Sequence, residues 1–201
     1  MSTAAQFEPI SVSDYLVGER SAKRKHEYVY GVVYAMAGGS NRHNRIASNA
    51  IVSLGGQLVG EKCEAFNSDT KVRVRQSAGT RFYYPDVTVV CDPNSDADSF
   101  HDHPVVVIEV ISESTRRTDE HEKRDAYLSI DSLCVYVLIE QANAAAQVYR
   151  RADSGFDREV YLGLDAVIPL PEIDSELRLG DVYQNVVFTD NSEADEDSFD
   201  T

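Results

Sequence analysis

The chain has 201 residues, 42% of them hydrophobic, and its 34 acidic side chains against 19 basic ones give a formal net charge of −15. This size and composition predict one compact globular domain, and the negative charge excludes a protein that coats nucleic acid with a broad basic surface, because such affinity comes largely from lysine and arginine contacts to phosphates. No apolar run reaches the length of a membrane-spanning helix and residues 1–10 lack the pattern of a secretion signal, so we expect a cytoplasmic protein without a membrane segment.

The first expected elements are a short helix and a hairpin. Ser11 or Ser13 can cap a helix that continues to about Glu19, because a serine side chain accepts hydrogen bonds from the free amides of a first turn. Residues 25–37, KHEYVYGVVYAMA, are rich in β-branched and aromatic residues around Gly31. This composition predicts a hairpin or a bent strand.

A long helix and three strands are expected next. Residues 40–60 predict a helix with one face on the core, because apolar side chains recur every four positions, at Ile46, Ala50, Leu54 and Leu58. We expect the strands at residues 63–67, 71–76 and 82–91. In the second strand, KVRVR alternates charged residues with valine, as a strand with one buried face does.

The second half of the chain predicts a strand, a helix and a strand joined by a crossover. Residues 104–111, PVVVIEVI, form a nearly unbroken β-branched run, which is typical of a central strand covered on both faces. The polar residues 92–103 before it predict a surface loop. Residues 115–130 predict a charged helix and residues 133–140 another strand, and the rest up to residue 187 predicts short antiparallel strands and turns.

Two carboxylates interrupt the apolar strands. Asp86 stands in FYYPDVTVV and Glu109 in VVVIEVIS. Burying an isolated charge costs on the order of several kcal/mol. Such a residue therefore normally has a partner, a shifted pKa or a metal. If the strands are neighbours, the pair offers hard oxygen ligands for Mg²⁺ or Mn²⁺. The alternative for Asp86 is a residue that bonds to backbone amides at the start of a strand.

The helix after Glu109 supplies a candidate ammonium. Asp119, Lys123 and Tyr127 follow each other at four-residue spacing and so share one helix face. Lys123 can then assist the attacking water or the phosphate in metal-assisted hydrolysis. The alternatives are a surface ion pair between Lys123 and Asp119, and a core role for the Tyr127 ring.

Several of these segments together resemble the Uma-type restriction endonuclease family of the PD-(D/E)XK nuclease superfamily. The likeness covers about residues 11–187, and its marks are Glu27, Gly31 and Met36 in HEYVYGVVYAM, His43, YPDVTVVCD, VVVIEVISEST, and the helix of Asp119, Lys123 and Tyr127.

The resemblance implies a restriction-endonuclease-like fold of mixed α/β (α+β) type, with a central mixed β-sheet flanked by helices. It implies metal-dependent DNA cleavage, with Asp86 and Glu109 as the metal carboxylates, Lys123 as the catalytic lysine and Glu27 as a further acidic group. His43 and Tyr127 are possible accessory residues.

One position departs from the superfamily pattern. Ile111 stands two residues after Glu109, where the superfamily usually has lysine, and Lys123 is its natural replacement from the helix. The departure and the acidic composition keep a second hypothesis open, a noncatalytic module that acts in protein or nucleic-acid interaction. A homodimer is expected in either case, because twofold dimers are the commonest oligomers.

The remaining charges and the cysteines complete the prediction. We expect a single domain at residues 1–188 and a disordered tail at 189–201, because the tail holds six acidic side chains and no basic one. The basic residues are dense in four places and could form a rim around one cleft: Arg20 to Lys25, Arg42 and Arg45, Lys71 to Arg75, and Arg116 to Arg124. The three cysteines, Cys63, Cys91 and Cys134, are expected to be buried thiols.

Overall fold

The computed structural model describes residues 8–112, 116 and 118–188, so the predicted acidic tail lies outside the described residues. The elements, in chain order, are α1 (Val12–Glu19), β1 (His26–Val29), β2 (Val32–Ala35), α2 (Asn41–Gln57), β3 (Glu64–Asn67), β4 (Lys71–Gln76), β5 (Gly79–Tyr83), β6 (Val87–Val90), β7 (Phe100–His101), β8 (Pro104–Ile111), η1 (Thr118–Lys123), α3 (Arg124–Tyr127), β9 (Val135–Glu140), β10 (Ala145–Ala152), β11 (Gly155–Leu162), β12 (Val167–Leu170), η2 (Pro171–Ile173), β13 (Ser175–Arg178) and α4 (Leu179–Val182).

The described strands form three sheets. The largest has six strands in the order β11-β10-β9-β8-β6-β3, and it is mixed because β8 and β9 run parallel whereas the other pairs are antiparallel. The parallel pair confirms the predicted crossover, whose helical segment is η1 and α3. A second sheet has the order β2-β1-β5-β4-β7, and β12 and β13 form a separate pair.

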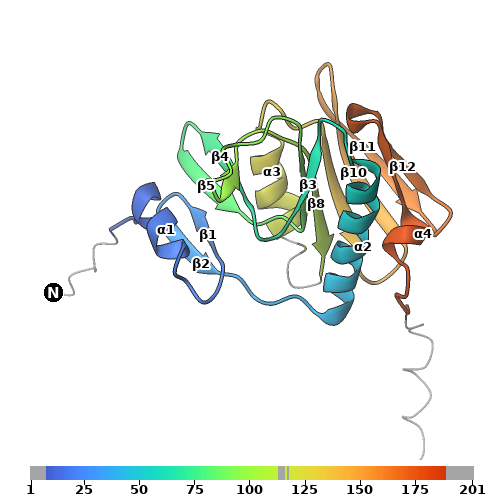
Figure 1. The fold of residues 1–201 in the computed structure, drawn as a ribbon, viewed down its shortest axis with the longest axis horizontal. Coiled ribbons are helices and arrows are strands. Elements are labelled where there is room, and N and C mark those ends of the chain that lie inside the picture. The colour runs from blue at the N-terminus through green and yellow to red at the C-terminus, as the bar shows by residue number, and fades with distance from the viewer. Residues whose placement is uncertain (1–7, 113–115, 117, 189–201) are drawn as a thin grey trace, which may run out of the picture.

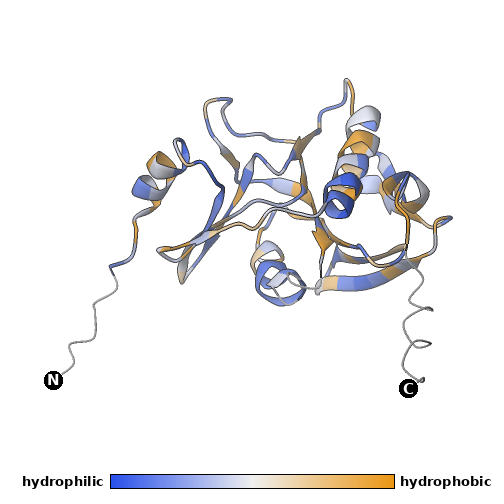
Figure 2. Ribbon diagram, turned by 90° about the horizontal axis from the view of Figure 1, so that it is seen from below, coloured by the Kyte–Doolittle hydropathy of each residue, from blue (hydrophilic) through white to orange (hydrophobic). Residues whose placement is uncertain are grey.

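The six-stranded sheet has a helix on each face. Alternate residues of β8 point to opposite sides: Val106, Ile108 and Val110 pack with α2, while Val107 and Ile111 pack with α3. Figures 1 and 2 show these two helices on opposite faces of the sheet. The predicted central mixed sheet flanked by helices is therefore present. Of the described helices, none has the length and apolar character that a bilayer crossing requires.

The first two helices and the hairpin follow the sequence prediction. Ser11 caps α1, because its side chain accepts a hydrogen bond from the amide of Asp14. Gly31 turns the β1–β2 hairpin with a φ of 93°, a left-handed conformation that favours glycine. In α2 the predicted stripe of Ile46, Ala50 and Leu54 is fully buried.

The prediction of one continuous strand at residues 82–91 is wrong. The segment divides into β5, in the five-stranded sheet, and β6, in the six-stranded sheet. Pro85 lies at the break and has no amide hydrogen to donate to a ladder. The break lets one run of apolar residues join two sheets, and it leaves Asp86 just before β6.

Two further expectations need correction. The loop predicted at residues 92–103 contains β7, which pairs in parallel with β4 and buries both of its residues. The helix predicted at residues 115–130 is shorter in the structure. Of the described residues, Arg116 is helical and a continuous helical segment runs from Thr118 to Tyr127. The first part of this segment, Thr118–Lys123, is a π-helix. Single π-helical turns are rare and occur frequently at functional sites.

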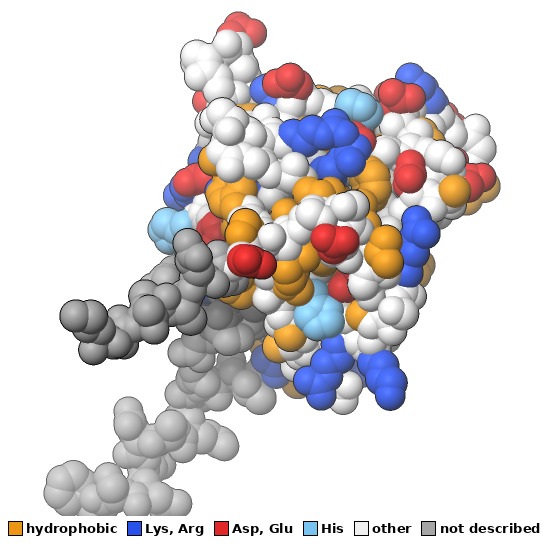
Figure 3. All heavy atoms as spheres, turned by 90° about the vertical axis from the view of Figure 1, so that its left-hand side faces the viewer, with side chains coloured by type: hydrophobic (Ala, Val, Ile, Leu, Met, Phe, Trp, Pro, Cys, Tyr) orange, Lys and Arg blue, Asp and Glu red, His pale blue; other side chains and the backbone are white. Residues whose placement is uncertain are grey.

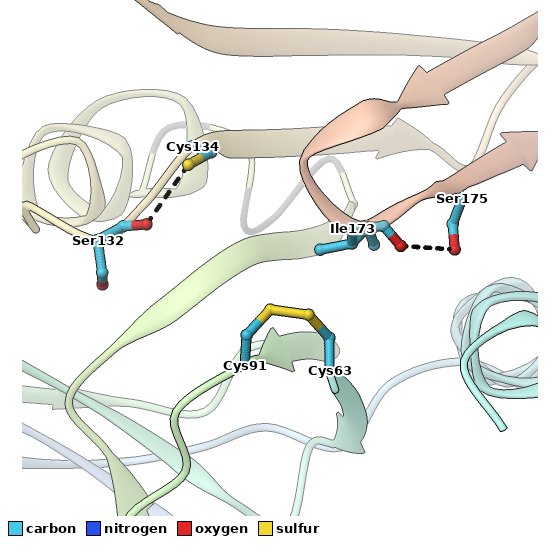
Figure 4. The surroundings of a disulfide bond; sticks show 6 residues. All are labelled: Cys63, Cys91, Ser132, Cys134, Ile173 and Ser175. Atoms are coloured by element: carbon cyan, nitrogen blue, oxygen red, sulfur yellow. Dashed lines mark hydrogen bonds between the residues drawn. A yellow bond between two sulfur atoms is a disulfide. The ribbon is translucent and has the colours of Figure 1, made fainter. Parts of the chain in front are cut away.

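Two of the three cysteines are not free thiols. Cys63 and Cys91 form a disulfide between the outer ends of the paired strands β3 and β6 (Figure 4). The expectation failed because the two residues lie 28 positions apart in the sequence and meet only through the strand register. Cys134 is the free cysteine, and its thiol faces the carbonyl of Ser132.

This disulfide predicts the thiol content of the protein. Denatured, unreduced protein purified in air should react with one equivalent of a thiol reagent per chain, from Cys134, and with three equivalents after reduction. A Cys134→Ser variant is the control, with no reactive thiol before reduction. Three reactive thiols in the unreduced wild type would contradict the disulfide.

Candidate functional site

A cleft of about 850 Å³ opens beside the carboxyl-terminal part of β8. Its lining comes from the segment before β1, the β2–α2 connection, the start of α2, the segment before β6, β8 and η1. The residues are Arg24, Lys25, Met36, Ala37, Gly38, Gly39, Ser40, His43, Asn44, Ser68, Tyr84, Asp86, Glu109, Val110, Ser112, Asp119, Lys123 and Gln141.

Glu109 reaches this cleft because of the alternation of β8. It shares the face of Val107 and Ile111, so its side chain points toward α3, and it is only 4% exposed. Its Oε1 accepts a hydrogen bond from the Tyr127 hydroxyl at 3.2 Å and another from Lys123 Nζ at 3.4 Å. The two neighbours are residues that the sequence placed on one helix face.

Lys123 is a buried ammonium among three carboxylates. Its Nζ lies 2.9 Å from Glu27 Oε1, 3.4 Å from Glu109 Oε1 and 3.5 Å from Asp119 Oδ1. Glu27 comes from β1 in the five-stranded sheet, so the cluster joins both large sheets. The surface ion pair considered for Lys123 and Asp119 is excluded, because the two residues are 8% and 3% exposed.

Asp86 lies across from Glu109. The β6–β8 register pairs Val87 with Ile108, and its continuation by one residue places Asp86 opposite Glu109 on the same face. Asp86 Oδ2 accepts a hydrogen bond from the backbone amide of Val110 at 2.8 Å, and His43 Nε2 lies 3.2 Å from the same oxygen. Asp86 therefore does both things that were considered for it: it accepts a hydrogen bond from a backbone amide, and it lines the cleft.

Burial shifts the protonation of these groups. Burial raises the pKa of Glu109 well above its usual value; Lys123 opposes this shift, and the charges of Asp119, Asp86 and Glu27 add to it. Burial lowers the pKa of Lys123, but the carboxylates of Glu109, Glu27 and Asp119 outweigh it and raise that pKa well above its usual range. Lys123 therefore stays an ammonium.

The pKa of His43 is raised as well. Burial lowers it, whereas the hydrogen bond and the charge of Asp86 raise it by more. Three carboxylates, those of Glu27, Glu109 and Asp119, surround Lys123, and the charge of Asp86 acts on Glu109 as well, so the acidic groups of this cluster outnumber its one lysine.

The chemistry of the donors fits a hard divalent cation. Carboxylate oxygens are the ligands that Mg²⁺ and Mn²⁺ prefer, and the negative surplus attracts a cation. Glu27 Oε1 is buried without a directed hydrogen bond, although the Lys123 ammonium faces it. Among the described residues no three acidic, histidine or cysteine groups converge closely enough to hold an ion. Mg²⁺ commonly binds through one or two carboxylates and keeps several waters, and the facing carboxylates of Asp86 and Glu109 fit such a donor set.

The structure brings the predicted site residues together. Asp86, Glu109, Lys123 and His43 line the cleft, while Glu27 and Tyr127 contact its lysine and its glutamate from behind. The sequence interpretation missed Asp119 as a member of the buried cluster. Its position four residues before Lys123, on the face that ends in Tyr127, was the available signal.

The predicted basic rim is present only in part. Of the four basic segments, Arg24, Lys25 and Lys123 line the cleft. Other members form ion pairs elsewhere: Arg73 with Asp102, and Arg116 with Glu140. The face that carries α1, β1 and β2 shows separate basic groups among acidic and apolar ones, with no continuous basic surface (Figure 3).

Comparisons with known proteins show the family of the chain. A family model, Uma2, described as "Putative restriction endonuclease", matches residues 12–180. Two proteins of Synechocystis sp. are similar: the uncharacterized protein slr1290, at 34% identity over 77% of this chain and 80% of its own length, and the uncharacterized protein sll1609, at 28% over 75% and 86%.

A solved structure has the same fold. The crystal structure of a "putative nuclease belonging to DUF820" from Anabaena variabilis superposes with a TM-score of 0.71 at 18% identity, covering 89% of this chain and 100% of that chain. The predicted fold class is confirmed by this likeness.

The surplus of negative charge predicts an effect on stability. Glu109→Gln keeps the size of the side chain and removes one charge, so we expect the free energy of unfolding in metal-free buffer to be unchanged or higher at pH 8. Burial holds the pKa of wild-type Glu109 above its unfolded value, so the wild type loses stability as pH rises through the folded pKa. The gain of the variant should therefore shrink at pH 5, as measured by chemical denaturation at both pH values.

Asp102→Asn is the matched control with the opposite sign. Burial raises the pKa of Asp102, but the hydrogen bonds from Arg73 and Asn94 lower it by more, so its stabilisation is present above the unfolded pKa and is lost as pH falls through the folded value. This variant should lose about 1 to 3 kcal/mol at pH 8. A loss of about 3 to 5 kcal/mol for Glu109→Gln at both pH values would instead mark a purely structural ion pair.

Proposed function

The chain belongs to the Uma2 family, whose model is described as "Putative restriction endonuclease", and from this membership we propose that it is a Mg²⁺- or Mn²⁺-dependent endonuclease that hydrolyses phosphodiester bonds of DNA. The observation that carries the proposal is the buried Lys123 with its three carboxylate partners at the wall of a cleft, together with Asp86 opposite Glu109. A cytoplasmic homodimer, which would present two clefts to the two strands of a duplex, is part of the same proposal.

Asp86 and Glu109 are the residues proposed to hold the metal. They lie opposite each other on two neighbouring strands, and their orientation is fixed by hydrogen bonds from the Val110 amide and the Tyr127 hydroxyl. A bound divalent cation supplies a Lewis acid that lowers the pKa of a water molecule and offsets charge on a phosphoryl oxygen. The remaining steps depend on side chains of the protein.

Lys123 is proposed to stabilise negative charge rather than to accept a proton. Its pKa is raised by Glu109, Glu27 and Asp119 despite burial, so at neutral pH it has no free electron pair to serve as a base. A fixed ammonium in a site with little water interacts strongly with charge that develops on the phosphate or on the attacking oxygen. Glu27 and Tyr127 act as positioning residues, because they hold Lys123 and Glu109 in place.

A noncatalytic module is the second candidate. It is favoured by one observation, that Lys123 already has three carboxylate partners and Asp86 Oδ2 already has the Val110 amide and His43. In that case the cluster would tie the sheets together without chemistry. Metal binding and cleavage distinguish the two candidates.

The metal carboxylates can be tested directly. Calorimetric titration of MnCl₂ into the wild type should show binding that is lost in Asp86→Ala and Glu109→Ala, and supercoiled plasmid should be nicked only by the wild type. Asp92→Ala, in an exposed position outside the cleft, is the control and should behave as the wild type. A wild type that folds but shows neither binding nor nicking would favour the noncatalytic module.

The role of Lys123 predicts a different pattern. Lys123→Met should lower the nicking rate by about 100-fold or more, the size typical for loss of one charge-stabilising group. Its affinity for Mn²⁺ should be equal to or higher than that of the wild type, because a competing cation has been removed from the carboxylates. Lys62→Met, an exposed lysine outside the cleft, controls for the loss of charge. Full activity in Lys123→Met would contradict this role.

A further inference from the structure

The lining of the cleft contains two groups of charged residues, an acidic one and a basic one, which are called here its acidic end and its basic end. Asp86, Glu109 and Asp119 line the acidic end together with Lys123. The other end is lined by Arg24, Lys25, Ser68 and Tyr84, with no carboxylate among its described lining residues. A nuclease site needs cation-binding carboxylates at the reacting phosphate and basic groups for the rest of the nucleic-acid backbone, so the second end requires its own explanation.

Arg24 and Lys25 differ in how they are held. Arg24 is exposed and forms no ion pair with any residue that the structure describes. Lys25 Nζ donates to the carbonyl oxygen of Ser68 at 2.6 Å and lies 2.7 Å from Asp69 Oδ1, yet its side chain keeps 36% exposure. The side chain of Lys25 is thus held in direction by its partners and is partly exposed to solvent. The exposed guanidinium of Arg24 is available for a ligand.

The ring of Tyr84 lies beneath two ammonium groups. Lys25 Nζ is 5.5 Å and Lys71 Nζ is 4.9 Å from the ring centroid. The Tyr84 hydroxyl accepts a hydrogen bond from Lys71 and donates one to Glu19 Oε1 at 3.0 Å. Lys71 is 3% exposed and forms no direct ion pair with a described carboxylate; it is held by this hydroxyl and by the nearby charge of Glu19.

The two ends of the cleft are joined by a short piece of chain. Tyr84 is separated from Asp86 only by Pro85, which restricts the backbone between them. The backbone of Tyr84, which belongs to the basic end, is therefore close to that of Asp86, which belongs to the acidic end. Consecutive phosphates of one DNA strand are about 3.4 Å apart along the helix axis, so a cleft with a reacting phosphate at one end has neighbouring phosphates to place at the other.

We propose that Arg24 and Lys25, supported by Tyr84 and Lys71, form a subsite that binds a backbone phosphate of DNA next to the phosphodiester that is cut. The proposal rests on the proposed function, because it assigns the reacting phosphate to the acidic end. The subsite reads no base, since its donors are charged groups that suit phosphate oxygens, so it adds affinity without sequence preference. Arg24 is its most exposed donor and the residue to test.

The first experiment measures duplex binding by fluorescence anisotropy in CaCl₂ over a range of KCl concentrations, and nicking kinetics in MnCl₂. Arg24→Ala should weaken binding and reduce the slope of log K against log salt by about 0.9, the value for one lost phosphate contact. In nicking, it should raise KM with little change in kcat, because the contact is equal in the ground and transition states. Lys62→Ala, which removes an exposed lysine outside the cleft, should leave the affinity, the salt slope and KM unchanged.

The second experiment identifies the phosphate. A set of duplexes, each with one uncharged methylphosphonate in place of a phosphate, is bound to the wild type and to Arg24→Ala. At one position close to the cut, the penalty of the methylphosphonate should disappear in the variant, because the two changes remove the same contact.

The outcomes separate this subsite from the proposed function. The subsite is overturned, and the nuclease remains, if the wild type nicks DNA but the effects of Arg24→Ala and of the methylphosphonates on binding are additive at every position. An unchanged salt slope in Arg24→Ala has the same meaning. Binding without nicking, with one non-additive position, supports the subsite and counts against catalysis. A wild type that neither binds nor nicks DNA overturns both.

Discussion

The buried ammonium of Lys123 is the interaction on which the arrangement of the cleft depends. Its three carboxylate partners come from β1, β8 and η1, which belong to the five-stranded sheet, the six-stranded sheet and the helical crossover. Removing Lys123 would leave its three buried carboxylates without a counterion, which is strongly destabilising. The N-terminal hairpin is therefore tied to the rest of the described chain by charge as well as by the packing of Tyr28 and Phe82.

Strand β8 has apolar packing on both faces and a buried carboxylate, Glu109, on one of them. Val106, Ile108 and Val110 belong to the core under α2, and this continuous apolar face keeps the strand fixed. The opposite face carries Glu109, and the π-helical turns of η1 bring Asp119 and Lys123 to it. A rare backbone conformation at this point is consistent with a site that places charge where regular structure would not.

Local sequence patterns could predict the helices and strands with strong periodicity. They could not predict the contacts between strands that are described below, because those strands are distant from each other in the sequence. The four-residue repeat gave α2, and the β-branched run gave β8, because burial on one or both faces leaves a direct trace in the sequence. The separation of β5 from β6, the strand β7 and the Cys63–Cys91 bond depend on which strand lies beside which. Asp86, Glu109 and Lys123 were recognisable as charges in apolar surroundings or on a shared helix face. Asp119 was placed on that helix face but given no role in the site, because its burial depends on how the helix packs on the rest of the chain.

The position of the lysine also has a structural reason. Ile111, where a strand-borne lysine would stand in the superfamily pattern, is 1% exposed and packs in the apolar cluster with Tyr127 and Leu138. An ammonium there would replace core packing, while Lys123 reaches Glu109 from the helix without opening that cluster. The same geometry makes the charge of the site depend on η1, because any change in those π-helical turns moves Lys123 relative to Glu109. The strand thus supplies the carboxylate and the helix supplies its ammonium partner.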